Sequence, residues 1–211
     1  MAVKIPIKID SQKTALLVID MQNDFTEKGA ILEIPDIRMG FPELKKFIGT
    51  CRSNGVAVVY TRHTYSPEGN PIEACLFPKL DDGDMRKNTH GWEINDFLKP
   101  ESDDVIIDKK RYDAFYETSL EEILKKKGIT DILIAGTMTE VCCDSTARSA
   151  MFRDYRVWIV SDLNFTRDEN KHKYSLEIFA SNFGWVVKSD EILKILDSAE
   201  VKKGEILFPR V

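Results

Sequence analysis

The chain has 211 residues, of which 43% are hydrophobic and 31% are charged, and its formal net charge at pH 7 is −5. This length is enough for one well-buried domain, so we expect a single domain over residues 1–211. The acidic balance, without a basic stripe that could neutralise phosphates, argues against nucleic acid as a partner. Because the apolar runs are far shorter than the roughly 20 residues that span a bilayer, we expect no membrane partner either.

The N-terminal segment and the cysteines both indicate the compartment in which the protein works. The first residues, MAVKIPIKIDSQK, lack the unbroken apolar core of a signal peptide. Four cysteines in a chain of this size do not make a disulfide framework. We therefore expect a cytoplasmic protein, in which an unusual thiol indicates catalysis rather than a bridge.

Six short apolar runs follow one another along the chain. They are TALLVI (14–19), VAVVYT (56–61), DVIIDK (104–109), DILIAG (131–136), RVWIVSD (156–162) and GWVVKS (184–189). Each is rich in Val and Ile with little polar alternation, which is typical of strands buried on both faces of a parallel sheet.

Helical patterns lie between several of these runs, at 42–55, 118–128, 141–155 and 169–184. The pattern at 118–128 starts with a Thr-x-x-Glu capping box and ends at a glycine. Strands alternating with helices predict an α/β fold, a three-layer, doubly wound and mainly parallel sheet with right-handed crossovers. The longer and less regular segments 21–41 and 62–103 are of the kind that often form the walls of a site.

An acid, a lysine and a thiol follow three of the predicted strands. Asp20 follows the first strand, Lys109 ends the third, and the fourth leads through a Gly-Thr turn to Cys142 and Cys143. Since open α/β sheets bind ligands at the carboxyl ends of their strands, these side chains are expected at the same edge. The pattern indicates a nucleophilic site.

The chemistry of such a site explains its parts. A thiol is mostly protonated near pH 7, whereas the thiolate is the nucleophile. A cysteine in the first turn of a helix is favoured as an anion by the helix dipole, and a nearby lysine adds to this effect. A carboxylate can take the thiol proton and pass it to a leaving amine, while backbone N–H groups hold the oxyanion. The chain's three histidines, His63, His90 and His172, lie outside the strand-end motif of the cysteines.

Each residue also has a plainer interpretation. A free cysteine in a helix is often only a small buried hydrophobe. Asp20 could cap a loop, and Lys109 could be a solvated charge in the DKKR run.

Three segments, LLVIDMQNDF, VIIDKKRYDAFYETSLEEIL and ILIAGTMTEVCCDSTARSA, together resemble the isochorismatase-like cysteine hydrolases, in the family's order and spacing from about residue 13 to 190. That superfamily includes nicotinamidases, N-carbamoylsarcosine amidase, ureidoacrylate hydrolases and biuret hydrolases. The resemblance implies a six-stranded parallel sheet and an Asp-Lys-Cys triad. Asp20 matches the D-x-Q-x-D-F motif, Lys109 begins K-x-R-Y-x-A-F, and Cys142 ends G-x-x-T-x-x-C.

The same resemblance implies roles for the neighbouring residues. Cys142 is the nucleophile, and Cys143, where relatives often carry valine, is a packing residue. The family also has a cis peptide in the turn before the nucleophile, which by position joins Thr137 and Met138. The N–H groups of Met138 and Cys142 then form the oxyanion hole.

The implied reaction is hydrolysis of a C–N bond in a small amide or ureido compound through a thioester, with no cofactor and no metal. Asp20 exchanges the protons, and Lys109 keeps Asp20 and Cys142 ionised and oriented. For the wall of the substrate pocket we expect Phe25, His63, Tyr112 and Phe115, with plain packing as the alternative for each.

Other functions stay open at this point. Nicotinamidases bind a metal through Asp-x-His after the second strand, where this chain has Thr61-Arg62-His63. Isochorismate pyruvate-hydrolases, which cleave a vinyl ether, commonly lack the cysteine. A binding protein without turnover is disfavoured by the intact triad. A thiol redox protein is disfavoured because redox cysteines are normally spaced Cys-x-x-Cys.

The C-terminal segment GEILFPRV (204–211) is apolar and too short to build a core of its own. Such a segment is usually docked on something, either its own domain or another subunit. Because many members of the family are dimers or tetramers, we expect a homo-oligomer, with two-fold symmetry as the first choice.

Overall fold

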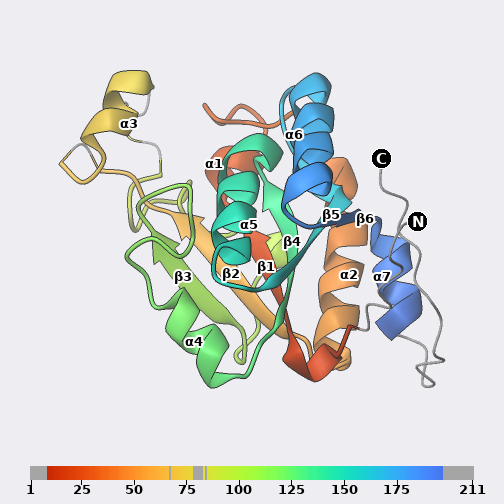
Figure 1. Ribbon diagram of the computed structural model, residues 1–211. Helices are drawn as coiled ribbons and strands as arrows, with labels where there is room; N and C mark the ends of the chain where they lie inside the picture. Colours follow the sequence, from red (N-terminus) through yellow and green to blue (C-terminus); the bar gives the residue numbers. More distant parts are fainter. Residues whose placement is uncertain (1–8, 67, 78–82, 84, 197–211) are drawn as a thin grey trace.

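The computed structural model describes residues 9–66, 68–77, 83 and 85–196 (Figure 1). Six parallel strands form one sheet in the order β3-β2-β1-β4-β5-β6. They are β1 (Thr14–Ile19), β2 (Ala57–His63), β3 (Val105–Lys109), β4 (Asp131–Thr137), β5 (Arg156–Phe165) and β6 (Trp185–Val187). The predicted α/β fold is therefore confirmed, with each strand within a few residues of its predicted ends. The apolar C-terminal segment 204–211 lies outside the described residues.

Side chains of β1 point alternately to two apolar layers, which is why this strand reads as an unbroken apolar run. Leu16 and Val18 belong to a cluster with α2 (Phe41–Ser53) and α7 (Ser189–Leu196). Ala15, Leu17 and Ile19 belong to a second cluster with α4 (Leu120–Lys126), α5 (Asp144–Met151) and α6 (Glu169–Asn182). The sheet is thus the middle of three layers, as Figure 1 shows.

Two helix starts differ from the sequence prediction. The pattern at 141–155 does not begin as an α-helix, because Thr139–Cys143 form a π-helical turn, η5, and α5 starts only at Asp144. The prediction of a capping box at the start of α4 is wrong. The Thr118 hydroxyl does accept the N–H of Leu120, but the Glu121 carboxylate pairs with Lys125 and Arg153 instead of returning to the helix start.

The two irregular segments contain short helices and contact each other at the carboxyl end of the sheet. The helices are α1 (Asn23–Thr26), η2 (Ile37–Gly40), α3 (Pro71–Leu76) and η4 (Asp96–Leu98). Gln22 and Ile94 form an antiparallel bridge, and the Gln22 amide donates to the carbonyls of His63 and Trp92. In Figure 1, α3 stands out beyond the end of β2. Among the described residues, no helix is long and apolar enough to cross a membrane.

Candidate active site

The three residues expected to form a triad lie in contact at the carboxyl edge of the sheet. Asp20 directly follows β1, Lys109 is the last residue of β3, and Cys142 lies in η5, just after β4. The Lys109 Nζ atom is 2.7 Å from Oδ2 of Asp20 and 3.4 Å from Sγ of Cys142. Asp20 and Lys109 are fully buried, and Cys142 is 5% exposed. The structure therefore brings together an acid, an ammonium group and a thiol shielded from water.

Asp20 is held by its neighbour on β2. Thr61 donates from Oγ1 to Oδ1 of Asp20 at 2.6 Å, and the same hydroxyl oxygen accepts the Asp20 N–H at 3.1 Å. The backbone of Asp20 has φ of +47°, a region in which aspartate is tolerated better than most residues. Thr61 was missed as a functional residue, because nothing in its local sequence indicates which strand end it will face.

Lys109 is charged despite its burial. Burial alone lowers the pKa of an amine, but the Asp20 carboxylate, followed by the contact with Cys142, outweighs it and holds the pKa of Lys109 above its usual range. Lys109 also donates to the carbonyl of Arg111 at 3.1 Å. The ammonium group is thus the fixed positive centre of the site.

Cys142 is at rest a neutral thiol. Burial is the largest influence and raises its pKa, Lys109 lowers it, and the Asp20 carboxylate raises it again. The pKa therefore stays above that of an ordinary thiol, so attack on a substrate requires a base. Cys143 is fully buried in the second apolar cluster, where burial raises the pKa of its thiol as well.

The turn before Cys142 is anchored on both sides. The peptide bond between Thr137 and Met138 is cis, at the position that the family resemblance implies. The Met138 carbonyl accepts the N–H groups of Val141 and Cys143, at 3.1 and 3.2 Å. Thr139 Oγ1 lies 2.9 Å from Nδ1 of His172, whose pKa is lowered by burial.

His63 is placed directly against the triad. Its Nδ1 atom is 3.4 Å from Nζ of Lys109, and its Nε2 atom is 3.0 Å from Oε1 of Glu73. Glu73 also accepts the side-chain amide of Asn70 at 2.7 Å. Burial raises the pKa of Glu73, but its contacts with His63 and Asn70 and the charge of Lys109 outweigh burial. The pKa therefore lies below its usual value, and the group is a carboxylate at neutral pH.

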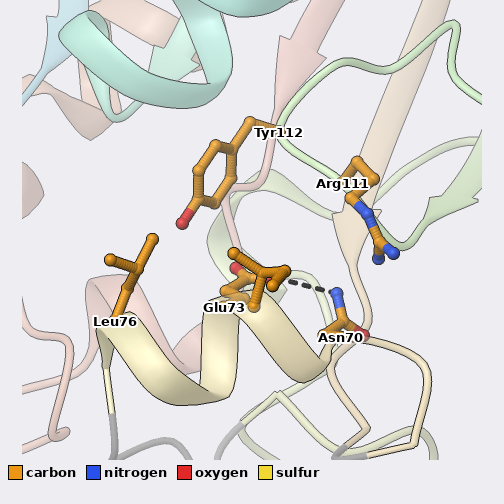
Figure 2. Close-up of a pocket in the computed structure, with 6 residues that line it drawn as sticks. Asn70, Glu73, Leu76, Arg111 and Tyr112 are labelled. Atoms are coloured by element: carbon orange, nitrogen blue, oxygen red, sulfur yellow. Dashed lines mark hydrogen bonds between the residues drawn. The ribbon is translucent and has the colours of Figure 1, made fainter.

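A pocket of about 190 Å³ opens between α3 and the segment after β3 (Figure 2). It is lined by Asn70, Ile72, Glu73, Leu76, Arg111 and Tyr112. Figure 2 shows the Tyr112 hydroxyl pointing toward the helix that carries Glu73 and Leu76. Burial, followed by the charge of Glu73 and the proximity of Cys142, raises the pKa of Tyr112. Asn70 and Glu73 were missed because they lie in a segment without periodicity.

The other two residues expected in the pocket wall lie in the apolar layers. Phe115 stacks on Tyr155 with ring centres 6.0 Å apart, in the second cluster. Phe25 belongs to the first cluster. A contact of either ring with substrate stays a prediction.

Asp20, His63 and Cys142 could in principle hold a metal ion, because their donor atoms all lie within 4.8 Å of one another. The ammonium group of Lys109 contacts all three of these side chains. A metal cation at that point would face the repulsion of a buried positive charge. As arranged, these donors fit the Lys109 ammonium and do not fit a metal.

Known proteins support the family expectation. The chain is 31% identical to Nicotinamidase 3 of Arabidopsis thaliana over 193 residues, covering 89% of this chain and 90% of that protein. It is 26% identical to the ureidoacrylate amidohydrolase RutB of Methylorubrum extorquens over 219 residues, covering 94% of this chain and 88% of that protein.

The fold and the family model agree with these relatives. A cysteine hydrolase from Pseudomonas syringae pv. phaseolicola 1448A superposes with a TM-score of 0.87 at 29% identity, covering 92% of this chain and 97% of that one. The family model of the isochorismatase domain matches residues 14–191. The resemblance carried by the three sequence segments is thereby confirmed, and the chain belongs to the isochorismatase family.

Proposed function

We propose that this protein is a cysteine hydrolase that cleaves a C–N bond of a small amide or ureido compound. The observation that carries the proposal is the buried ammonium group of Lys109, which contacts both the Asp20 carboxylate and the Cys142 sulfur. Its relatives include an amidohydrolase and a nicotinamidase, whose names point to the same class of bond.

The first half of the reaction forms a thioester. Asp20 takes the proton of the Cys142 thiol, and the thiolate attacks the carbonyl carbon of the substrate. Asp20 then gives that proton to the departing nitrogen, so the C–N bond breaks and an amine or ammonia leaves. Because the resting thiol is neutral, this transfer to Asp20 is a necessary step.

The second half uses water. Asp20, again a carboxylate, removes a proton from a water molecule that attacks the thioester, and the Cys142 sulfur leaves and regains a proton. The net reaction adds one water across the C–N bond. Lys109 stays charged throughout and stabilises whichever of Asp20 and Cys142 carries negative charge.

The oxyanion of both tetrahedral intermediates is assigned to the N–H groups of Met138 and Cys142. The N–H groups of Val141 and Cys143 bind the Met138 carbonyl, so these two donors are already engaged within the turn. The small pocket bounded by Glu73, Arg111 and Tyr112 suits a compact polar substrate.

Nicotinamide is the second candidate substrate, because Nicotinamidase 3 is 31% identical to this chain. Isochorismate, with vinyl ether cleavage, is the third. A panel of small amides, ureides, nicotinamide and isochorismate, followed by ammonia release and by mass, separates the three. Ammonia release from an amide or ureide, absent in Cys142→Ala, is the expected result; loss of pyruvate from isochorismate without ammonia would contradict the proposal.

We also propose that the protein is cytoplasmic and forms a homo-oligomer, a dimer or a tetramer. All four cysteines are free thiols, as a reducing compartment would keep them. Ile72 and Leu76 on α3 and Phe152 after α5 expose large apolar surfaces that a subunit contact would cover. Light scattering tests the assembly, and a mass near the 24.1 kDa of one chain would contradict it.

A further inference from the structure

The ammonium group of Lys109 faces more acceptors than it has hydrogens. It carries three N–H hydrogens, and the side chain is fully buried. Asp20 is its shortest contact, an ion pair at 2.7 Å, and the Arg111 carbonyl accepts a hydrogen bond at 3.1 Å. Cys142 Sγ and His63 Nδ1 both lie 3.4 Å away. The third hydrogen is therefore shared between the nucleophile and an imidazole.

The surroundings of His63 define which of its nitrogens carries the proton. An ammonium group only donates, so Nδ1, which faces Lys109, must be the bare nitrogen. Nε2 then carries the hydrogen, and it lies 3.0 Å from Oε1 of the Glu73 carboxylate. Glu73 is fixed in turn by Asn70, whose amide also binds the carbonyl of Lys110. A doubly protonated ring would place a second positive charge against Lys109.

The two acceptors differ in how they change during catalysis. A thiolate is a strong, charged acceptor, whereas the sulfur of a thiol or a thioester is a weak one. The imidazole stays the same in every state. When the sulfur is neutral, the third hydrogen of Lys109 has a better partner in His63 than in Cys142.

We propose that His63 is a positioning residue that accepts the third hydrogen of Lys109 whenever the Cys142 sulfur is neutral, and releases it when the thiolate forms. The inference rests on the proposed function, since the thioester is one of the two neutral states. No covalent bond changes at His63; only a hydrogen bond moves. His63 thereby stabilises the resting thiol and the acyl-enzyme relative to the thiolate.

The test is the pH profile of Cys142 alkylation by iodoacetamide, in a Cys75→Ser background because Cys75 is exposed. His63→Leu removes the acceptor and leaves the third hydrogen to the sulfur, which lowers the pKa of the thiol. Alkylation at pH 7 should become roughly tenfold faster, the scale expected when a buried donor loses its partner. If His63 instead served Cys142 as a base, alkylation would slow down, and if it only filled space, the profile would not move.

His63→Asn is the matched control. Its side chain has the same number of heavy atoms and the same branching as leucine, and its amide oxygen can occupy the place of Nδ1, so the wild-type profile should return. Both variants leave unchanged the groups that face the imidazole, which are Lys109, Glu73, Tyr112, Asp20 and Cys142. Equal profiles in the two variants would overturn the proposal.

Two further readouts separate this proposal from the function on which it rests. Nitrogen NMR of the His63 ring, assigned by its loss in His63→Asn, should show the Nε2–H form without any turnover. A doubly protonated ring at pH 7, or equimolar metal held by wild type and lost in His63→Leu, would contradict the assignment. Failure of the proposed function would appear elsewhere, as hydrolysis that persists in Cys142→Ala.

Discussion

Thr61 and Asp20 bind each other twice, through one hydroxyl group that donates to the carboxylate at 2.6 Å and accepts the backbone N–H at 3.1 Å. Asp20 directly follows β1, Thr61 lies on the neighbouring strand β2, and both are fully buried. One hydroxyl thus fixes both the side chain and the main chain of the proposed catalytic acid.

Replacing Thr61 should therefore damage catalysis more than packing. Thr61→Val keeps the shape but removes both hydrogen bonds, which should cost about 1.5–3 kcal/mol for a bond to a charged group. We expect kcat to fall roughly tenfold or more, with the loss measured by steady-state kinetics. Thr61→Ser keeps the hydroxyl and should stay near wild type; equal losses in both variants would show that the methyl group matters instead.

Replacing each of the two adjacent cysteines should have different effects on activity. Cys142→Ala should abolish turnover and leave the circular dichroism spectrum unchanged, because the sulfur that attacks the substrate is gone. Cys143 is fully buried among apolar side chains, so Cys143→Ala should cost roughly 1 kcal/mol of stability and keep the activity. An inactive but folded Cys143→Ala protein would refute the assignment.

Lys109 should prove to be a stabilising residue as well as a catalytic one. Lys109→Met leaves the Asp20 carboxylate buried without its cation, and breaking a buried pair in this way costs about 3–5 kcal/mol. Urea unfolding measures the loss. The double variant Asp20→Asn/Lys109→Met removes both charges and should recover much of the stability without any activity, whereas a double variant as unstable as the single one would argue against the ion pair.

Stability should fall in alkaline solution, and Cys51 offers a clean measure. Burial raises the pKa of this thiol from 9.0 to about 12, so the folded chain holds its proton more tightly than the unfolded chain. That contribution is complete below pH 9 and is lost as the pH rises toward 12, at up to about 1.4 kcal/mol per pH unit. Thermal unfolding between pH 8 and 11 should show a shallower decline in Cys51→Ala; an unchanged slope would contradict the shift.

Gly136 should be among the least replaceable residues of the sheet. Its φ is +124°, and a Cβ there would collide with the backbone of Ile19, one residue before the catalytic acid. Gly136→Ala should cost several kcal/mol, while Gly128→Ala, with φ of +67° and open space around it, should cost only about 1–2 kcal/mol. Similar melting temperatures for the two variants would refute the argument from close approach.

The strands and the meeting of Asp20, Lys109 and Cys142 could be predicted because both depend on local sequence. A strand buried on both faces reads as a short Val/Ile run, and these three residues follow or end such runs. Thr61, Asn70 and Glu73 could not be predicted, since their roles depend on which strand end or helix lies opposite them. The start of α5 was misplaced for a related reason: the π-helical turn that presents Cys142 has the same apolar spacing as an α-helix.

The proposed catalytic residues come from two parts of the chain, one that forms β1 to β3 and one that forms β4 to β6. In the described sheet, β1 and β4 are the only pair that joins the first three strands to the last three, through Thr14–Ile19 and Asp131–Gly136. Asp20 and Lys109 precede the exposed turn at Gly128, and Cys142 follows it. We expect a chain cut at this turn to yield two inactive fragments, with hydrolysis returning only when they pair. Fused to two interacting proteins, the fragments form a split reporter whose signal is ammonia.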